Sequence, residues 1–204
     1  MSLIIAGIHT GIGKTICSAI ICQALGWDYW KPVQAGDLEN SDSVFIKKNV
    51  NHPSCFIHPE AYRLSVPASP HYAAAVDGIG IKRAHIKLPA SANEIVVETA
   101  GGLMSPLAKG FLNIDLIEWL NLPVILVCYD YLGSINHTLL SVAALSQRNL
   151  PIKGIVFSGE AVDSTRQFIL EHTQLPLLFS IPQLTNPEAE TIQKFASEVL
   201  INIL

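Results

Sequence analysis

The stretch GIHTGIGKTI, residues 7–16, is the most informative segment of this chain. It follows a short apolar run and precedes a helical pattern of apolar residues, which predicts a strand, a turn and a helix. Gly11 and Gly13 let the backbone approach an anion closely, and the helix adds its positive N-terminal end. Lys14 is then placed to reach the β- and γ-phosphates of a nucleotide, and the Thr15 hydroxyl is placed to hold Mg²⁺. The stretch therefore indicates a phosphate-binding loop.

The spacing of this loop differs from the common pattern G-x-x-x-x-G-K-[ST]. The position of the first glycine in that pattern is Ile8 here, and the glycine comes one place earlier, at Gly7. An alternative interpretation is a helix that merely begins with glycine, lysine and threonine. The apolar run before the loop and the helical pattern after it favour phosphate binding.

Short apolar runs alternate with helical stretches along the 204 residues. This order predicts one α/β domain over residues 1–204, with a mostly parallel sheet and helices on both faces, like that of P-loop NTPases. The segment 36–70 is the least regular, and a long excursion of this kind is more often functional than structural. The expected strands are 3–7, 28–33, 94–98, 123–129, 152–157 and 176–181, and the expected helices are 14–25, 41–48, 70–76, 113–120, 134–148, 163–173 and 187–203, the last with Asn186 as its N-cap.

The composition favours a sheet buried on both faces, because 50% of the residues are hydrophobic and 15% are charged. The net charge of −4 argues against nucleic acid as a partner. The apolar runs are shorter than the ~20 residues that cross a bilayer. We therefore expect no membrane span and no signal peptide, and we predict a cytoplasmic protein.

The four cysteines, Cys17, Cys22, Cys55 and Cys128, show no paired C-x-x-C spacing. Buried free thiols that behave as small hydrophobic groups are expected, and a zinc site is not. The seven histidines are scattered and form no ligand pattern such as H-E-x-x-H.

Two acidic residues are candidates to complete a Mg²⁺ site with Thr15, because Mg²⁺ prefers oxygen ligands and commonly takes one or two carboxylates. Glu98 ends an apolar run, so its carboxylate is expected at the C-terminal edge of the sheet, where α/β folds bind ligands. An acid at the end of a buried strand is costly unless something binds it. Asp42 begins a predicted helix, and two interpretations stay open for it: a metal ligand, or a first-turn acid that interacts with the helix dipole.

Lys31 lies near the expected end of the second strand, within DYWKPVQAG at 28–36. A lysine at this place is poorly solvated unless it faces an anion. One interpretation is a side chain that extends along a sheet edge to reach water. The other is a second positive charge close to Lys14.

A series of short motifs occurs in order along the chain: GIHTGIGKT at 7–15, KPVQAG at 31–36, NSD at 40–42, SPH at 69–71, VETAGGLMSPL at 97–107, LPVILV at 122–127, LGSINHT at 132–138 and IPQL at 181–184. Together these motifs resemble the dethiobiotin synthetases, the ATP-dependent ligases that close the ureido ring in biotin synthesis. The resemblance covers nearly the whole chain. It also explains the displaced first glycine, which is the family's own form of the loop.

The resemblance implies a reaction in which negative charge accumulates. Carbon dioxide adds to an amine of 7,8-diaminononanoate to give a carbamate, the carbamate attacks the γ-phosphate of ATP, and the second amine closes the ring as phosphate leaves. Lys14 and Lys31 are implied as catalytic residues that stabilise these oxyanions, with Mg²⁺ on Thr15, Asp42 and Glu98. The family is also a homodimer, which implies that the loop 132–137 reaches a substrate carboxylate in the partner subunit.

The resemblance assigns the other site residues to ATP or to the diamine. The expected ATP-binding residues are Gly11, Ile12, Gly13, Lys14, Thr15, Ile16, Asp42, Glu98, Thr99, Ala100, Gly101, Ser158, Gly159, Pro182, Gln183 and Leu184. The expected substrate-binding residues are Thr10, Lys31, Ala35, Gly101, Gly102, Gly133, Ser134 and Asn136. The expected partners are 7,8-diaminononanoate, CO₂ or bicarbonate, ATP and a second copy of the chain.

Five positions depart from the family pattern. His9 stands where the loop often has aspartate, Gly11 where it can have glutamate, and Thr99 where a glycine is usual. Ala35 replaces a hydroxyl residue near the substrate, which removes a hydrogen bond of about 1 kcal/mol. Ser158 stands where an asparagine often binds the adenine edge, which predicts relaxed base selectivity. The charged residues of the expected site are retained, and this favours a working enzyme.

Two other classes of protein fit part of the pattern. A nucleotide-dependent switch of the kind that partitions plasmids or positions division sites shares this fold and a related loop. Those loops usually have an extra lysine where His9 stands, and such switches tend to have a membrane-targeting helix or a basic face, whereas ETIQKFASEVLINIL at 190–204 is acidic to neutral. The other class is a non-catalytic binding protein. A ligase should bind both ATP and the diamine, and a switch should bind only the nucleotide.

Overall fold

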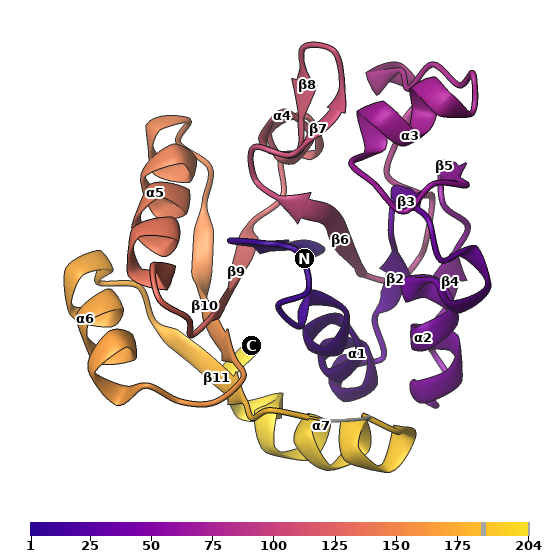
Figure 1. Cartoon of the computed structure of the whole chain (residues 1–204). Helices are drawn as coiled ribbons and strands as arrows, with labels where there is room; N and C mark the ends of the chain where they lie inside the picture. The colour runs from indigo at the N-terminus through magenta and orange to yellow at the C-terminus, as the bar shows by residue number, and fades with distance from the viewer. Residues whose placement is uncertain (185–186, 204) are drawn as a thin grey trace.

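The computed structural model describes residues 1–184 and 187–203, and most of its strands form one parallel sheet (Figure 1). The strands of this sheet are β1 (Leu3–Gly7), β2 (Asp28–Trp30), β4 (Ile57–His58), β6 (Ile95–Gly102), β9 (Val124–Tyr129), β10 (Ile152–Ser158) and β11 (Leu177–Ile181). Their order across the sheet is β11-β10-β9-β1-β6-β2-β4, and every adjacent pair is parallel.

Helices lie on both sides of the sheet, and two small sheets lie beside it (Figure 1). The helices are α1 (Lys14–Leu25), α2 (Asp42–Asn49), α3 (Pro70–Val76), α4 (Asn113–Leu120), α5 (Ser134–Gln147), α6 (Asp163–Thr173) and α7 (Ala189–Ile203), with 3₁₀ helices η1 (Leu38–Asn40) and η2 (Arg83–His85). The small sheets pair β3 (Val33–Ala35) with β5 (Tyr62–Leu64) and β7 (Pro106–Ala108) with β8 (Phe111–Leu112). Among the described helices, none is long and apolar enough to cross a membrane.

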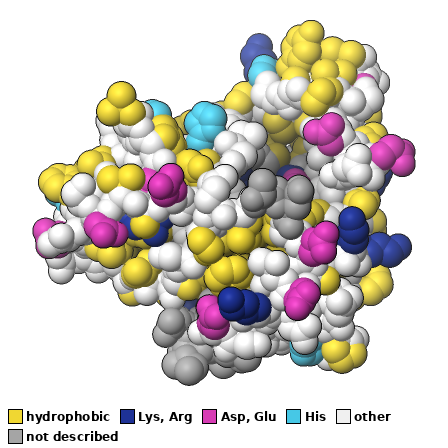
Figure 2. Space-filling model, turned by 60° about the horizontal axis from the view of Figure 1, so that its bottom comes forward, with side chains coloured by type: hydrophobic (Ala, Val, Ile, Leu, Met, Phe, Trp, Pro, Cys, Tyr) yellow, Lys and Arg dark blue, Asp and Glu magenta, His cyan; other side chains and the backbone are white. Residues whose placement is uncertain are grey.

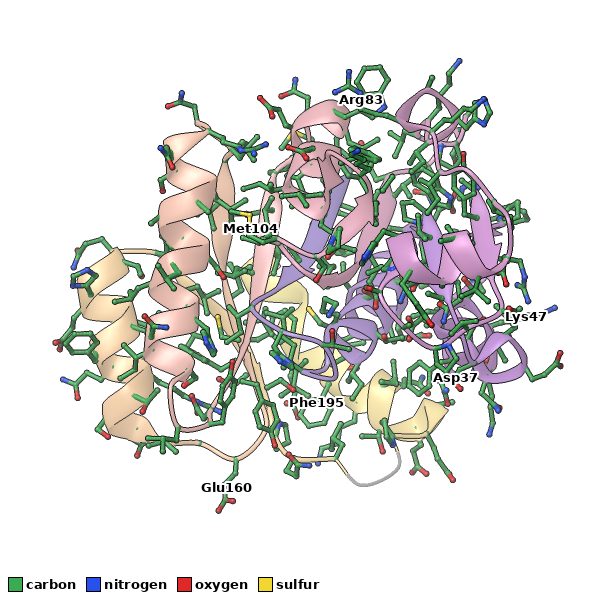
Figure 3. The ribbon with its side chains drawn as sticks, turned by 45° about the horizontal axis from the view of Figure 1, so that its top comes forward. Asp37, Lys47, Arg83, Met104, Glu160 and Phe195 are labelled. Carbon is green, nitrogen blue, oxygen red and sulfur yellow. The ribbon has the colours of Figure 1, made fainter. Side chains whose placement is uncertain are left out.

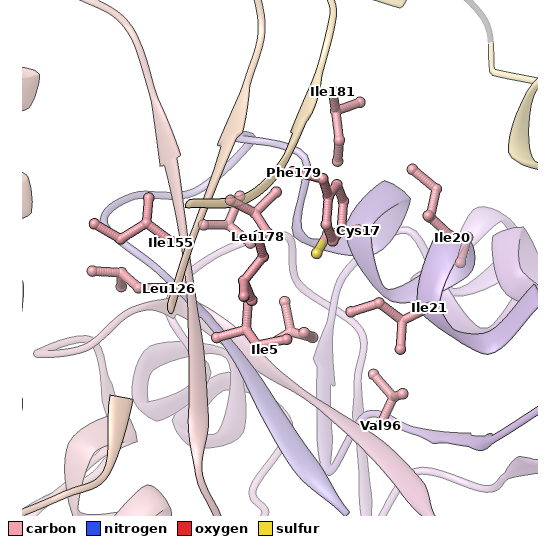
Figure 4. Close-up of a cluster of buried hydrophobic side chains, with 14 of the residues drawn as sticks. Ile5, Cys17, Ile20, Ile21, Val96, Leu126, Ile155, Leu178, Phe179 and Ile181 are labelled. Atoms are coloured by element: carbon pink, nitrogen blue, oxygen red, sulfur yellow. The ribbon is translucent and has the colours of Figure 1, made fainter. Parts of the chain in front are cut away.

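Two hydrophobic clusters pack the helices against the sheet. One packs the sheet against α1, α2, α6 and α7, and Figure 4 shows Cys17, Ile20 and Ile21 of α1 directed toward the strand residues of this cluster. The other packs the sheet against α3, α4 and Leu145 of α5. The burial of both sheet faces explains why the strands are continuous apolar runs. The expected mostly parallel α/β fold is confirmed.

Several element boundaries differ from the sequence prediction. The run at 28–33 forms two strands, because Lys31 and Pro32 leave the sheet and proline has no N–H to donate to a ladder. The run at 94–98 continues as β6 to Gly102. Helix α2 begins one residue later than expected, after Ser41, whose hydroxyl accepts a hydrogen bond from the Val44 N–H at 3.4 Å.

The C-terminal helix and the irregular segment also differ in detail. Helix α7 begins at Ala189, two residues after the expected start at 187, and the expected N-cap Asn186 lies outside the described residues. The segment 36–70 contains η1, α2, β4 and β5. Its strands have two and three residues, which is too short to show periodicity in the sequence.

The strand order brings the C-terminal ends of β1, β6 and β2 side by side. From β1 the chain continues to β2 on one side of β1 in the sheet, and after β6 it continues to β9 on the other side of β1. The strand order therefore reverses at β1, and open α/β sheets bind ligands in the crevice at the C-terminal edge of such a point.

In Figure 2, which brings the bottom of Figure 1 forward, acidic, basic and hydrophobic side chains are interspersed on the surface.

Candidate active site

The loop between β1 and α1 has the backbone geometry that an anion site requires. Gly11 and Gly13 have φ values of 71° and 88°, in the left-handed region that favours glycine. A Cβ at Gly13 would lie 2.4 Å from the Ser158 hydroxyl, so this position also has no room for a side chain. Lys14 begins α1, and its Nζ donates to the His9 carbonyl at 3.0 Å. The lysine therefore lies across the loop, as in a phosphate-binding arrangement.

Thr15, Asp42 and Glu98 converge at the first turn of α1. The Thr15 hydroxyl lies 2.8 Å from Asp42 Oδ1 and 2.9 Å from Glu98 Oε1. Glu98 is 1% exposed, and its other oxygen, Oε2, accepts hydrogen bonds from Ser18 at 2.9 Å and from Tyr29 at 3.0 Å. These two bonds fix the carboxylate and leave Oε1 directed at the threonine.

Lys31 enters the same cluster from the end of β2. Its Nζ forms an ion pair with Asp42 Oδ2 and lies 3.7 Å from Glu98 Oε1. The side chain is 9% exposed, so it does not extend along a sheet edge into water. Asp42, for its part, contacts Thr15 and Lys31 in addition to its place in the first turn of α2. The structure thus favours the site interpretation for both residues.

Burial dominates the electrostatics of the two lysines. It lowers the pKa of Lys14 from 10.5 to about 8, against the opposite effect of the Glu98 carboxylate and with a further lowering by Lys31. Burial also lowers the pKa of Lys31, against the carboxylates of Glu98 and Glu60. Two partly desolvated ammonium groups favour an anion between them, because it would offset the cost of burying their charge.

The oxygen cluster fits Mg²⁺ by its chemistry. One hydroxyl and two carboxylates are hard oxygen ligands, and Mg²⁺ usually fills its other positions with water and phosphate oxygens. Within residues 1–184 and 187–203, no group of three or more histidine, cysteine, aspartate or glutamate side chains is arranged for a metal ion. The donor set of Thr15, Asp42 and Glu98 is suited to a Mg²⁺ ion that shares its other positions with the phosphate oxygens of a nucleotide.

Three cavities adjoin this cluster. One of 250 Å³ follows the loop from Thr10 to Thr15 and includes both lysines, and a second of 430 Å³ lies beside Lys31 and Ala35. The third, of 740 Å³, is mostly apolar and runs along α5, with Met104 on the side toward that helix (Figure 3). Thr10 lines all three cavities, so they surround one point of the loop.

The structure brings together most of the predicted diamine-binding residues. Thr10, Lys31, Ala35 and Gly101 line the 430 Å³ cavity, and Gly102 lines the 740 Å³ cavity. The other three, Gly133, Ser134 and Asn136, lie at the start of α5 and line none of these three cavities.

The predicted ATP-binding residues fall into two groups. Of the first group, the residues that line the 250 Å³ cavity are Gly11, Ile12, Gly13, Lys14, Thr15, Asp42, Glu98 and Gly101. Ile16 packs against the core, the Thr99 hydroxyl donates to the Ile5 carbonyl at 3.3 Å, and Ala100 lines the 430 Å³ cavity. The second group lies beyond β10 and β11, where Gly159, Pro182 and Gln183 line a separate cavity of 530 Å³. Ser158 lies between the groups, against Gly13, and Leu184 packs against the core.

Sequence reasoning missed the residues that hold the site in shape. Ser18 and Tyr29 bind Glu98, and Asn113 donates to the carbonyls of Ala100 and Gly102 at 2.6 and 2.9 Å. Ser18 follows Thr15 by three residues on α1, so helical spacing was an available signal. The sequence contains no comparable signal for Asn113, which approaches from α4.

Comparisons with known proteins agree with this geometry. The family model described as AAA domain matches residues 1–191. The "ATP-dependent dethiobiotin synthetase BioD" of Chlamydia pneumoniae is 45% identical over 178 residues, which cover 86% of this chain and 78% of the relative. The proteins of the same name from Christiangramia forsetii and Brucella ovis are 49% and 42% identical, covering 82% and 93% of this chain and 81% and 90% of the relatives.

Solved structures resemble the fold at low sequence identity. The septum site-determining protein MinD of Pyrococcus horikoshii, complexed with Mg-ADP, has a TM-score of 0.61 and 16% identity, with 98% of this chain and 96% of that chain covered. A ParA family ATPase from Chlorobium tepidum has a TM-score of 0.57 and 14% identity, with 98% and 90% covered. At this level of identity the likeness concerns the fold alone.

Proposed function

The chain belongs to the ATP-dependent dethiobiotin synthetase family, and we propose that the cluster of Lys14, Lys31, Thr15, Asp42 and Glu98 is where it closes the ureido ring. The activity is the ATP-dependent joining of CO₂ to 7,8-diaminononanoate, with ADP and phosphate as the other products. The observation behind the site assignment is that two buried lysines and two carboxylates meet at the first turn of α1.

The reaction explains why the site has two lysine side chains. One amine of the diamine bonds to CO₂ and loses a proton, which gives a carbamate anion. A carbamate oxygen attacks the γ-phosphorus as the bond to ADP breaks, and the second amine then attacks the carbamate carbon as phosphate leaves. Lys14 stabilises the transferring phosphoryl oxygens from the loop. Lys31 stabilises the carbamate oxygens and the γ-phosphoryl oxygens from the end of β2, so catalysis is mainly positioning and electrostatic stabilisation.

A divalent metal fits the same scheme. When bound, Mg²⁺ would neutralise charge on the phosphate oxygens, as in other phosphoryl transfers. Thr15, Asp42 and Glu98 are the residues that would hold it. Ser18 and Tyr29 keep Glu98 directed at this position, and Lys31 would exchange its contact with Asp42 for a contact with the substrate.

The cavities suggest how the diamine is oriented. The 430 Å³ cavity contains the Lys31 ammonium and is suited to the reacting end of the substrate. The 740 Å³ cavity is mostly apolar and is suited to the hydrocarbon chain. Thr10 and Ser105 line both cavities, so one molecule can occupy the two in sequence.

The family's homodimer gives a role to the start of α5. Gly133, Ser134 and Asn136 line none of the three cavities of their own subunit, and we propose that they bind the substrate carboxylate in the partner subunit. The N-terminus of a 14-residue helix is a favourable position for such an anion. Analytical ultracentrifugation should give the mass of a dimer, and a monomer with full activity would refute this assignment.

We also propose that the reaction takes place in the cytoplasm. The support is chemical: the reaction consumes ATP, and Cys17, Cys22, Cys55 and Cys128 are all free thiols, as in a reducing compartment. Fractionation of cells that express the chain tests this directly, and recovery outside the cytoplasm would contradict it.

A nucleotide-dependent switch shares the fold, but the 42–49% identity to dethiobiotin synthetases favours the ligase. The test is an assay with radiolabelled bicarbonate, Mg-ATP and 7,8-diaminononanoate. Label should enter an acid-stable ring, and omission of any one substrate should abolish this incorporation. ATP hydrolysis without incorporation of label, whether or not the diamine is present, would refute the proposed function.

A further inference from the structure

A buried ion pair at the C-terminal ends of β9 and β10 has no role in the proposed chemistry. Asp130 directly follows β9, and Arg166 lies on the first turns of α6. Arg166 Nε lies 2.5 Å from Asp130 Oδ2, and the two side chains are only 13% and 2% exposed. Burying two charged groups costs free energy, which further hydrogen bonds of the pair must offset. These additional hydrogen bonds show which part of the chain the pair fixes in place.

The ion pair holds both ends of one loop, residues 159–162. Arg166 Nη2 donates to the Gly159 carbonyl at 3.2 Å, and the Val162 N–H donates to Asp130 Oδ2 at 3.1 Å. The guanidinium carbon of Arg166 also lies 5.0 Å from the centre of the Phe157 ring, over its face. The loop between β10 and α6 is thus fixed by one aspartate and one arginine.

The fixed loop forms one wall of the 530 Å³ cavity. Gly159, Arg166 and Gln183 line this cavity, and the Tyr129 hydroxyl donates to Gln183 Oε1 at 2.8 Å. Gly159 has a φ of 90°, and a Cβ there would lie 2.3 Å from the Tyr129 ring, so the loop path is tightly constrained. The neighbouring Glu160 projects away from the body of the protein (Figure 3).

The place of this cavity relative to the phosphate-binding loop indicates its ligand. Ser158, which immediately precedes the fixed loop, is the residue that a Cβ at Gly13 would touch. A nucleotide whose phosphates lie on the loop from Gly11 to Thr15 therefore has this cavity next to it for its base. The cavity contains no part of the lysine and carboxylate cluster.

We propose that the Asp130–Arg166 pair is a positioning clamp for the nucleotide base. The pair keeps the wall of the 530 Å³ cavity in its binding conformation, and it takes no part in binding the phosphates or in ring closure. This proposal rests on the proposed function only in assigning a nucleotide to the site.

The variant Arg166→Lys tests the clamp. Lysine keeps a positive charge opposite Asp130, but its single ammonium cannot contact Asp130 and the Gly159 carbonyl with the fork geometry of arginine. Isothermal titration should show that the affinity for Mg-ADP falls roughly five- to tenfold, the size expected for loss of one hydrogen bond of ordinary net strength. The affinity for Mg-tripolyphosphate, which has phosphates and no base, should stay unchanged. In the assay, KM for ATP should rise and kcat should not.

Arg148→Lys is the matched control. Arg148, at the C-terminal end of α5, has its Nη1 2.6 Å from Asp115 Oδ1, so it also pairs with an aspartate, but it lines none of the four cavities described above. This control should bind both ligands like the unmodified chain. An unchanged affinity of Arg166→Lys for Mg-ADP, or an equal loss for both ligands, would overturn the proposal. Both titrations omit the diamine, so they are independent of whether the chain closes a ureido ring.

Discussion

At the scale of single residues, Lys31 distinguishes this site from an ordinary phosphate-binding loop. The loop alone supplies one ammonium group, that of Lys14. Lys31 adds a second from the residue that follows β2, beside Asp42 and Glu98. Both lysines are buried, and two buried ammonium groups close to one cluster of oxygen ligands are an arrangement suited to negative charge.

Replacing Lys31 should affect chemistry far more than nucleotide binding. In Lys31→Gln we expect kcat to fall by roughly a hundredfold or more, because a charge that stabilises the carbamate and the γ-phosphoryl group is lost. The affinity for Mg-ADP should change by about threefold or less, since the loop stays intact. Lys47→Gln, which changes an exposed lysine on α2, is the control and should behave like the unmodified chain. A near-normal kcat in Lys31→Gln would remove this residue from the mechanism.

Ser158 gives a prediction about the base. A serine hydroxyl cannot make the two simultaneous hydrogen bonds to an adenine edge that an asparagine amide can make. We therefore expect GTP or CTP to compete measurably with ATP in the ring-closing assay. Strict selectivity for ATP would show that other contacts, such as those of Gln183, select the base.

At the level of elements, β2 has a polar contact at its start and Lys31, the proposed catalytic lysine, just beyond its end. At the start, Asp28 is 2% exposed and accepts hydrogen bonds from Ser91 at 2.7 Å, from the Phe56 N–H at 3.0 Å and from Asn93 at 3.1 Å, with His58 at 2.9 Å. These contacts tie β2 to the loops around it. The position of Lys31, three residues later, depends on this anchoring.

Asp28→Asn should destabilise the folded protein in a pH-dependent way. Burial acts to raise the pKa of Asp28, but the hydrogen bonds from Ser91, Phe56, His58 and Asn93 outweigh it, and the net pKa lies below 3.8. The ionised carboxylate of Asp28 therefore stabilises the fold at pH values above 3.8, the ordinary pKa of aspartate. This stabilisation is lost as the pH falls through the lower pKa that Asp28 has in the folded state. Near neutral pH we expect a loss of about 2 kcal/mol in the free energy of unfolding.

Urea unfolding of the unmodified chain and of Asp28→Asn over a pH series measures this difference. The two free energies should approach each other in acid. A difference that stays constant from neutral pH into acid would show that the carboxylate charge is not the stabilising group.

The same strand shows what the sequence could and could not predict. Long apolar runs such as β9 and β10 were predicted nearly to the residue, because buried parallel strands have a strong signal. The run at 28–33 was predicted as one strand, although Pro32 already argued against a continuous ladder. The two-residue strand β4 and the hairpin of β7 and β8 are set by tertiary contacts, for which short segments have no periodic signal.

At the scale of the whole molecule, the strand order makes the site. The ends of β1, β2 and β6 lie side by side only because β6 pairs between the other two, and this order is a property of the complete chain. Motifs predicted Lys14, Lys31, Asp42 and Glu98 individually. Their convergence follows from a parallel sheet with β1 at its centre, whereas the supporting contacts of Tyr29 and Asn113 come from packing that no motif encodes.

We propose that both lysines and the oxygen cluster contact the same phosphate oxygens. A crystal structure of the chain with Mg²⁺ and a non-hydrolysable ATP analogue would reveal these contacts. We predict a metal ion bound by Thr15, Asp42 and Glu98, with the Nζ atoms of Lys14 and Lys31 both within hydrogen-bond distance of the γ-phosphate. A γ-phosphate that contacts Lys14 while Lys31 remains paired with Asp42 and directed away from it would contradict the account.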